Sequence, residues 1–376
     1  MAFLNPDFET HPERKRHLWL VSLTYPLMPS LGTVTAFLTG QAAWVWLPVA
    51  LVYLVIPCLE IFMGDDKSDL LGQMDSEAAM SPFYRYMVHG LLPIIYLTWI
   101  FGAWYVSSHD ISLINMIGAG LAHGLGLTFA INSGHETGHK TDRTSKWISL
   151  FMLAPSLYGH FRIEHNMGHH SHVATPKDSA TSYFGENFWG FMTREIPGAW
   201  KRAWSIESRR AERKSYSKFS IKNEVIHSTI LGIAAWGLML AIFGWVILPY
   251  LVIAWLYSVH SLSLQNFVAH YGLLRDKRPD GKYLPAEPKH SWNCNKLFTN
   301  LVSFNLARHS DHHANPSRHY QNLRTFPDAP QLPFGYSTMF ILAYFPPLFR
   351  RVMDPLVLNN VDGEMDKVLT RDMVKG

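Results

Sequence analysis

The stretch Ile111–Lys140, ISLINMIGAGLAHGLGLTFAINSGHETGHK, joins a long apolar run directly to two histidines spaced four residues apart. Residues 111–133 contain no charged side chain. As a helix they are long enough to cross a bilayer, which requires about 20 residues. Positions i and i+4 lie on one face of a helix, so His135 and His139 can hold one metal ion between them. The stretch therefore predicts a membrane-spanning helix that ends at a metal site.

Other apolar stretches of similar length surround this one. They contain no Lys or Arg, and Glu60 is their single acidic residue. Only 16% of the chain is charged, whereas soluble domains average about 25%. We therefore predict an all-α integral membrane protein with six transmembrane helices, at about residues 18–38, 42–63, 87–107, 111–133, 226–247 and 248–270.

The distribution of basic residues predicts the orientation of these helices. All 33 Lys and Arg residues fall in the N-terminal tail and in segments 64–86, 134–225 and 271–376. With six spans these four regions share one side of the membrane, and basic residues favour the cytoplasmic side. We expect a single domain over residues 1–376, with both termini and the catalytic segments 134–225 and 271–376 in the cytoplasm.

Further histidines occupy the predicted cytoplasmic segments, in EHNMGHH (164–170), HYGLLR (270–275) and RHSDHH (308–313). A catalytic zinc needs three protein ligands and a structural zinc needs four, so this number of clustered histidines predicts two metal ions. Imidazole suits iron, copper and zinc. We expect redox-active iron, although the ligand type leaves copper and zinc open. The candidate ligands are His135, His139, His165, His169, His170, His270, His309, His312 and His313.

The motifs HETGHK, EHNMGHH and RHSDHH resemble the three histidine boxes of the membrane-bound fatty-acid desaturase and hydroxylase superfamily. Together with HYGLLR, the segments HSWN, ANPSRHYQNLR and FPDAPQLPFGY resemble the alkane 1-monooxygenase family over nearly the whole chain. The resemblance implies that the nine histidines bind two irons. It also implies that O2 is the co-substrate and that the terminal methyl of an n-alkane becomes a primary alcohol. Electrons would come from rubredoxin and its NAD(P)H-dependent reductase, at the bacterial inner membrane.

Polar residues beside the ligands are candidates to orient the imidazole rings, commonly by accepting the second ring N–H. Capping of helix ends is their alternative role. The candidates are Glu136, Glu164, Asp311, Asn132, Asn166 and Asn266. The family usually carries a glutamate before the HYG histidine and a glutamine before RHSDHH, where this chain has Ala269 and Ala307. The resemblance therefore carries no proton-relay or ring-orienting role to these two positions.

Other functions remain to be weighed. His135–His139 also matches the H-E-x-x-H motif of zinc proteases, with Glu136 as the base, but that interpretation leaves most of the histidines unexplained. A metal transporter would place its ligands near the bilayer midplane, whereas these clusters follow the spans. A desaturase of fatty-acyl chains or a hydroxylase of aryl methyl groups would use the same metals. The two cysteines form no Cys-x-x-Cys pair, so no rubredoxin lies within these residues.

Two further segments have open interpretations. Trp200–Lys218, WKRAWSIESRRAERKSYSK, is basic and aromatic. It predicts either a helix at the membrane interface or a dock for an acidic protein. In the second span, Val52 and Val55 flank Tyr53. These small side chains either leave one helix face open to a substrate channel or face lipid.

Overall fold

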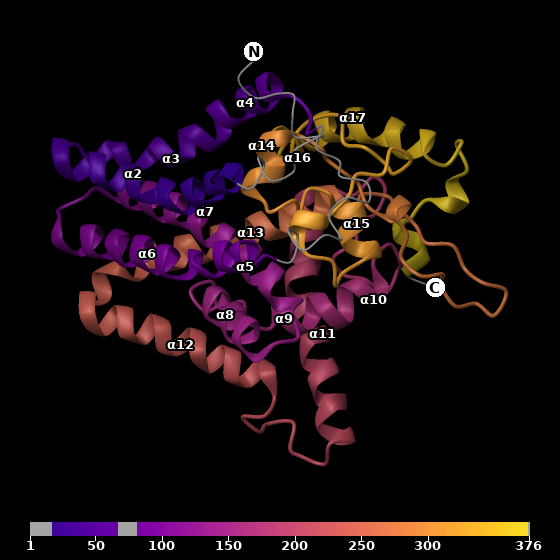
Figure 1. Cartoon of the computed structure of the whole chain (residues 1–376), viewed down its shortest axis with the longest axis horizontal. Coiled ribbons are helices and arrows are strands. Elements are labelled where there is room, and N and C mark those ends of the chain that lie inside the picture. Colours follow the sequence, from indigo (N-terminus) through magenta and orange to yellow (C-terminus); the bar gives the residue numbers. More distant parts are fainter. Residues whose placement is uncertain (1–16, 67–80, 375–376) are drawn as a thin grey trace.

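The computed structural model describes residues 17–66 and 81–374 (Figure 1). Within these ranges every regular element is helical, and extended segments pair only through isolated β-bridges. The all-α prediction is confirmed for this part of the chain. The N-terminal tail and most of the polar link at 64–86 lie outside the described residues.

The apolar helices form a bundle (Figure 1). They are α2 (Thr24–Thr39), α3 (Leu47–Ala50), α4 (Ile56–Met63), α5 (Pro82–His89), α6 (Leu91–Ser108), α7 (Leu113–Gly138), α12 (Glu224–Phe243) and α13 (Leu248–His270). The turn η2 (Ala42–Trp46) precedes α3, the π-helical η3 (Leu51–Val55) joins α3 to α4, and η5 (Trp245–Ile247) precedes α13.

Among the described residues, five stretches of helix are long and apolar enough to cross a membrane. They are Ala42–Met63, Pro82–Ser108, Leu113–Gly138, Glu224–Phe243 and Trp245–His270. The predicted first span is instead divided between the short 3-10 helix η1 (Trp19–Leu23) and the 16-residue α2. Pro26 lacks an N–H and cannot bond back to the preceding turn. Length and composition therefore support five spans in the part of the chain that the structure describes, whereas six were predicted.

Helix α7 lies at the centre of the bundle, between α2, α6 and α13. Its glycines explain how the backbones come so close. A Cβ at Gly120 would meet the side chain of Ile253, and a Cβ at Gly124 would meet Tyr257. Small residues at such positions let membrane helices pack backbone to backbone. The close pairing brings the last turns of α7 and α13, with His135 and His270, to the same end of the molecule (Figure 1).

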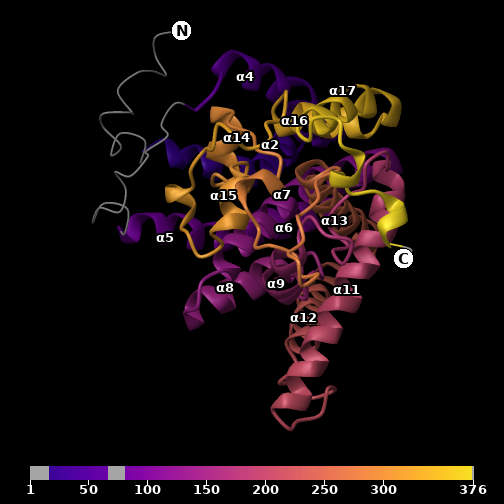
Figure 2. The same cartoon turned by 90° about the vertical axis from the view of Figure 1, so that its right-hand side faces the viewer.

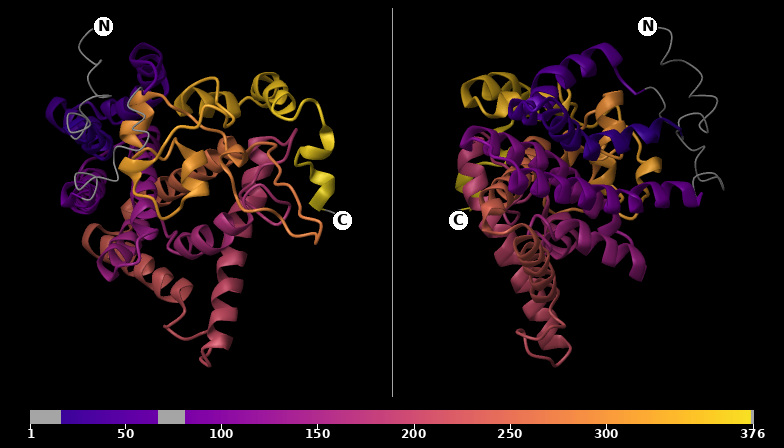
Figure 3. Two further views of the ribbon diagram at one scale, coloured as in Figure 1. Left: turned by 45° about the vertical axis from the view of Figure 1, so that its right-hand side comes forward. Right: turned by 90° about the vertical axis from the view of Figure 1, so that its left-hand side faces the viewer.

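The remaining elements gather around that end (Figure 2). They are α8 (Arg143–Leu153), α9 (Phe161–Ile163), the π-helical η4 (Glu164–His169), α10 (His170–His172), α11 (Phe188–Arg213), η6 (Pro288–His290), α14 (Leu297–Val302), α15 (His309–Ala314), η7 (Tyr320–Asn322), α16 (Tyr336–Ala343), α17 (Pro346–Asn359), η8 (Met365–Lys367) and η9 (Arg371–Val374). Helix α11 extends away from this group, and with the start of α12 it forms a projecting limb (Figure 3).

Candidate metal centre

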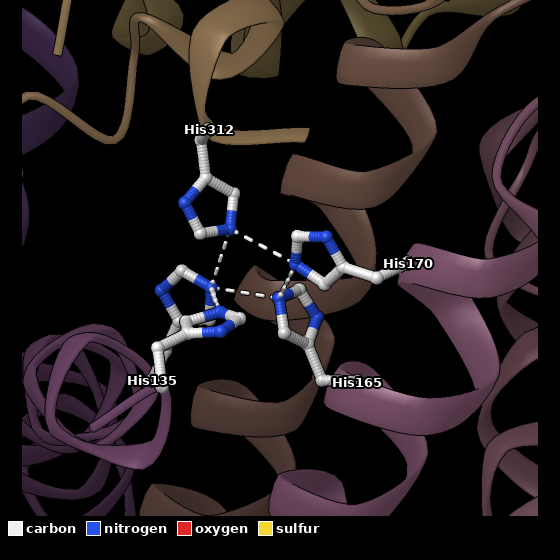
Figure 4. Close-up of side chains that lie close together, drawn as sticks. His135, His165, His170 and His312 are labelled. Carbon is white, nitrogen blue, oxygen red and sulfur yellow. Dashed lines mark hydrogen bonds between the residues drawn. The ribbon is translucent and has the colours of Figure 1, made fainter. Parts of the chain in front are cut away.

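Five imidazoles converge where α7 ends. His135 and His139 come from α7 and its C-cap, His165 and His170 from η4 and α10, and His312 from α15. The Nε2 of His135 lies 2.7 Å from that of His165 and 3.0 Å from that of His312. The Nε2 of His170 lies 2.9 Å from that of His165 (Figure 4). The candidate ligand atoms of all five residues lie within 4.8 Å of one another. We call them the five-histidine group.

Four further imidazoles form a second group beside the first. His169, His270, His309 and His313 also present ligand atoms within 4.8 Å of one another. The Nε2 atoms of His270 and His309 are 3.1 Å apart, and those of His309 and His313 are 3.0 Å apart. All four side chains are buried. The nine predicted ligands are therefore assembled as a five-histidine group and a four-histidine group.

The spacing of the nitrogens suits metal ligation. At a metal–nitrogen distance of about 2.1 Å, adjacent ligand atoms in a right-angled geometry are about 3 Å apart. Burial lowers the pKa of six of these histidines well below the ordinary value, and neighbouring imidazoles lower it further. These are His139, His165, His170, His309, His312 and His313. The rings are therefore neutral at pH 7, which is the form that binds a metal.

A π-helical turn determines how the second histidine box is shared. The N–H of His170 bonds to the carbonyl of His165, five residues earlier. In an α-helix, residues five apart point about 140° away from each other. The wider π turn returns His170 to the face of His165, so both belong to the five-histidine group, while His169 joins the other group.

The third box achieves the same division with ordinary α-helical geometry. His309 and His313 are four residues apart on α15 and share the four-histidine group, while His312 points into the five-histidine group. In both boxes the first and last histidines share one group and the penultimate histidine belongs to the other. The second box thus contributes His169 to the four-histidine group, and the third box contributes His312 to the five-histidine group. We call this the exchange of one imidazole between the boxes.

Asp178 holds one of the candidate ligands and was not predicted from the sequence. Its Oδ2 accepts a hydrogen bond from Nδ1 of His169 at 2.9 Å, and its Oδ1 accepts one from Arg202 at 2.8 Å. Burial alone would raise the pKa of Asp178, but the pairing with His169 and Arg202 lowers it below the ordinary carboxyl value. The carboxylate therefore keeps the proton of His169 on Nδ1, which leaves Nε2 free to face the four-histidine group.

The three predicted ring-orienting carboxylates have other partners. Asp311 accepts hydrogen bonds from Arg318, from Asn315 at 2.7 Å and from the backbone N–H of Arg324 at 2.7 Å, so it organises the segment after α15. Glu136 pairs with Lys140 at 2.8 Å.

Glu164 lies 3.3 Å from Arg202. Burial raises the pKa of Glu164 to about 8, although the charge of Arg202 opposes the rise. Glu164 and Asp178 therefore both pair with the guanidinium of Arg202, which lies next to the second histidine box.

The three predicted amides make structural contacts. The amide of Asn132 donates to the carbonyl of Ser303, and that of Asn166 donates to the carbonyl of Gly138. Asn266 donates to the buried Glu195 at 3.2 Å. These bonds fix the ends of the helices that carry the ligands.

An apolar cavity leads to both histidine groups. It has a volume of about 140 Å³, and its lining includes Val52, Ile56 and Leu125 as well as His135 and His309. Ala307 is part of the same wall and is buried. Ala269 is also buried, and its carbonyl accepts the N–H of Trp292. The methyl group of Ala307 therefore lies in the same cavity wall as His309.

A second, polar cavity reaches the five-histidine group from elsewhere. It has a volume of about 490 Å³ and is lined by Glu136, His139, Lys140, Asp142 and His319, among others. The described linings of the two cavities have no residue in common.

Comparison with known proteins shows similarity over most of the chain. Residues 112–343 match the family model of fatty acid desaturases. Alkane 1-monooxygenase 1 of Alcanivorax borkumensis is 41% identical over 362 residues, which cover 96% of this chain and 90% of the relative. Alkane 1-monooxygenase of Pseudomonas putida is 40% identical over 363 residues, with the same coverage. The xylene/toluene monooxygenase hydroxylase component XylM of Pseudomonas putida is 25% identical over 335 residues, covering 86% of this chain and 85% of the relative.

Proposed function

This chain belongs to the alkane 1-monooxygenase family, and from that premise we propose that it is a non-haem diiron enzyme that hydroxylates the terminal methyl of n-alkanes. The observation that carries the proposal is the position of the two histidine groups at one end of an apolar cavity. An apolar substrate and a pair of metal ions would meet there.

Iron is the metal that we propose for both groups, with the nine histidines as ligands. The donors are all nitrogen, and the two free cysteines stand outside both groups: Cys58 is exposed and Cys294 is buried elsewhere. When bound, the iron would supply the activation of dioxygen and the oxidising power to cleave a C–H bond that offers no acid or base handle. The chain itself keeps six of the imidazoles neutral by burial, and Asp178 fixes the direction of His169.

The cavity walls position the substrate. Val52, Ile56 and Leu125 line the part of the cavity formed by α7 and the second span, and a narrow apolar channel favours an extended alkyl chain. The carboxylate of Glu60 also lies on this wall, but it accepts a hydrogen bond from Thr299, which satisfies part of its polarity. An alkane that enters with its methyl end foremost presents that methyl to the histidines while the apolar walls exclude water.

The reaction needs electrons and protons from outside the cavity. An alkane, O2, two electrons and two protons give a primary alcohol and water. The two cysteines are free and build no redox centre. We propose rubredoxin as the electron donor, reduced by its NAD(P)H-dependent reductase, and the polar cavity beside His139 as the aqueous side of the site.

We place the protein in the bacterial inner membrane, with both termini and the histidine groups on the cytoplasmic side. The convergence of α7 and α13 on the end that carries the histidine segments supports this orientation (Figure 1). The confinement of basic residues to the polar segments supports it too. A sixth span through η1 and α2 belongs to the same proposal.

The alternative functions have less support. The protease motif would need Glu136 free to activate water, but Glu136 pairs with Lys140, and His135 and His139 converge with three more histidines. The xylene/toluene relative has 25% identity against about 40% for the alkane enzymes, so an aryl methyl substrate is less favoured than an alkane. A desaturase would yield an alkene, which distinguishes it by product.

The direct test is product analysis. Cells that express this chain with a rubredoxin and its reductase are fed a series of n-alkanes, and the products are identified by gas chromatography and mass spectrometry. We expect 1-alcohols from the wild type and none from His170→Ala. His172→Ala is the matched control, because His172 bonds to the carbonyl of Gly168 and belongs to neither group. Alkenes or secondary alcohols as main products would contradict the proposal.

A further inference from the structure

The projecting limb formed by α11 and the start of α12 takes no part in the metal centre. The N-terminal half of α11 is fixed to the body, where Glu195 accepts a hydrogen bond from Asn266 of α13. Its C-terminal half leaves the body, and the loop at 214–223 turns the chain back into α12. The turn is held because Oε2 of Glu207 accepts the N–H of Glu224 at 2.8 Å. The limb is therefore an ordered extension.

Helix α11 lies across the direction of the spans. Figure 1 shows α6 and α12 running along the body while α11 runs across them, beside the point where α12 begins. When the molecule is viewed from the end that carries the histidine segments, α11 extends beyond the other helices (Figure 2). If α12 crosses the membrane, α11 lies in the plane of the membrane surface.

One side of the limb exposes aromatic and aliphatic side chains. Trp189 and Trp200 are 47% and 46% exposed, although tryptophan is usually well covered in soluble proteins. Trp200 stacks on Trp204 with ring centroids 5.8 Å apart, and Trp204 contacts Phe219 at the same distance. Phe219 is 69% exposed. Trp189, Trp200 and Trp204 recur at helical spacing, so they form one stripe that ends at Phe219.

The limb also exposes many basic side chains. The exposed basic residues are Lys201, Arg209, Arg213, Lys214, Lys218 and Lys222. Two acidic residues, Glu207 and Glu212, occur between positions 201 and 222. Glu207 is buried and already pairs with Arg210 at 2.9 Å. The exposed tip of the limb therefore carries a positive charge.

We propose that the limb is an interfacial anchor that binds the headgroups of anionic phospholipids. Exposed tryptophans next to basic residues are the composition of helices that lie at a membrane surface, with the aromatic rings at the acyl boundary and the charges at the phosphates. Lys218 and Lys222 stand only a few residues before Glu224–Phe243, which is a candidate span. This proximity places the basic tip next to lipid headgroups.

An acidic protein is the less favoured partner for the same surface. A protein bound to the basic residues would leave Trp200 and Phe219 exposed, and Phe219 lies just before the candidate span Glu224–Phe243. Lipid satisfies the apolar stripe and the charges together. The inference depends on α12 crossing the membrane and is independent of the substrate and the metal.

The first test measures depth. A spin label is attached at Phe219→Cys in a Cys58→Ser background, and the full chain is placed in lipid nanodiscs. Electron paramagnetic resonance measures how often the label collides with dissolved oxygen and with a water-soluble nickel chelate. We expect the label at position 219 to be more accessible to oxygen than to the nickel chelate. Lys282→Cys is the control, because Lys282 is highly exposed in the loop after α13 and is expected to meet nickel. Equal access of nickel to both positions would overturn the proposal.

The second test measures lipid preference. Native mass spectrometry gives the retention of phosphatidylglycerol relative to phosphatidylcholine by the intact protein. Each basic residue near an anionic surface changes affinity about five-fold, so Arg209→Glu with Arg213→Glu should lower the retention ratio by at least that factor. Lys277→Glu with Lys282→Glu, in the loop after α13, is the matched control and should retain the wild-type ratio.

The two variants are compared at equal helix content and equal metal content, so that a folding defect is recognised. An unchanged ratio in the Arg209 and Arg213 variant overturns the proposal. The proposal is also overturned if this variant has a higher apparent KM for rubredoxin than the wild type in purely zwitterionic nanodiscs. That result would assign the basic tip to an acidic protein.

Discussion

His135 and His139 are one helical turn apart with their Nε2 atoms separated by 3.0 Å, yet they line different cavities. His135 lies on the wall of the apolar cavity and His139 on the wall of the polar one. The five-histidine group therefore separates an apolar compartment from an aqueous one. In the proposed reaction the alkane approaches on one side, and protons and water exchange on the other.

This separation predicts a difference in chemical accessibility. In metal-free protein, the water-soluble reagent diethylpyrocarbonate should modify His139 faster than His135, because only His139 lines the polar cavity. Ser317→Trp should slow the modification of His139 by narrowing the cavity, and peptide mass spectrometry would measure both rates. Ser205→Trp on α11 is the control and should change neither rate. Equal modification of His135 and His139 would refute the separation.

The neighbouring residues His312 and His313 should differ when they are removed. His312→Ala leaves four histidines in its group, whereas His313→Ala leaves three in the other. We expect about two irons per chain in the wild type and a larger loss of iron from His313→Ala, measured by plasma mass spectrometry. Both variants should lose alcohol formation, because each alters a proposed ligand set. Equal iron content in the two variants would argue against the five-and-four division.

Asp178 should control metal affinity through His169. Asp178→Asn removes the charge that fixes the His169 proton on Nδ1, and comparable losses of a ring-orienting partner weaken metal binding about 10- to 100-fold. Competition with a chelator would measure the loss. Asp276→Asn, which breaks a surface pair with Lys289, should leave the affinity unchanged.

A purely structural role for Asp178 would give a different result. Asp178→Asn would then lower the melting temperature without changing the metal affinity of the folded fraction, because only the contact with Arg202 would be lost.

Val52 should set the length of alkane that the cavity accepts. Val52 is 8% exposed and lines the apolar cavity, while Val55 on the same helix is 42% exposed and is absent from that lining. Val52→Trp should lose activity on the longest alkanes and keep it on shorter ones, because the ring fills the far part of the channel. Val55→Trp should retain the full range. Gas chromatography of competing alkanes measures both, and a uniform loss in Val52→Trp would indicate a folding defect.

The sequence indicated which histidines gather at the candidate metal centre, but it did not indicate how they are arranged there. Each of the nine histidines follows a long apolar run or recurs at short spacing, and both signals are local. The division into groups depends on the π turn at His165–His170, which no residue pattern in EHNMGHH indicates. Asp178 was not predicted because it lies in a loop of irregular structure, and a loop contact such as its hydrogen bond with His169 leaves no periodic signal in the sequence.

For the helices, too, local sequence signals predicted the elements better than their arrangement. Apolar length predicted α7 and α13 well, because few other folds bury runs of that kind. It failed to show how the segment around Pro26 divides into η1 and α2, since hydropathy carries no information on backbone donors. The basic and aromatic character of Trp200–Lys218 was visible in the sequence, whereas its position across the spans was decided only by tertiary structure (Figure 1).

The exchange of one imidazole between the second and third boxes links the two halves of the centre thermodynamically. His169 shares a π turn with His165, and His312 shares a short helix with His309, so an ion at either group orders a ring that the other group needs. The first ion lowers the conformational cost of binding the second, which is positive cooperativity. Under limiting iron the protein should therefore divide into empty and fully loaded molecules, with half-loaded chains scarce.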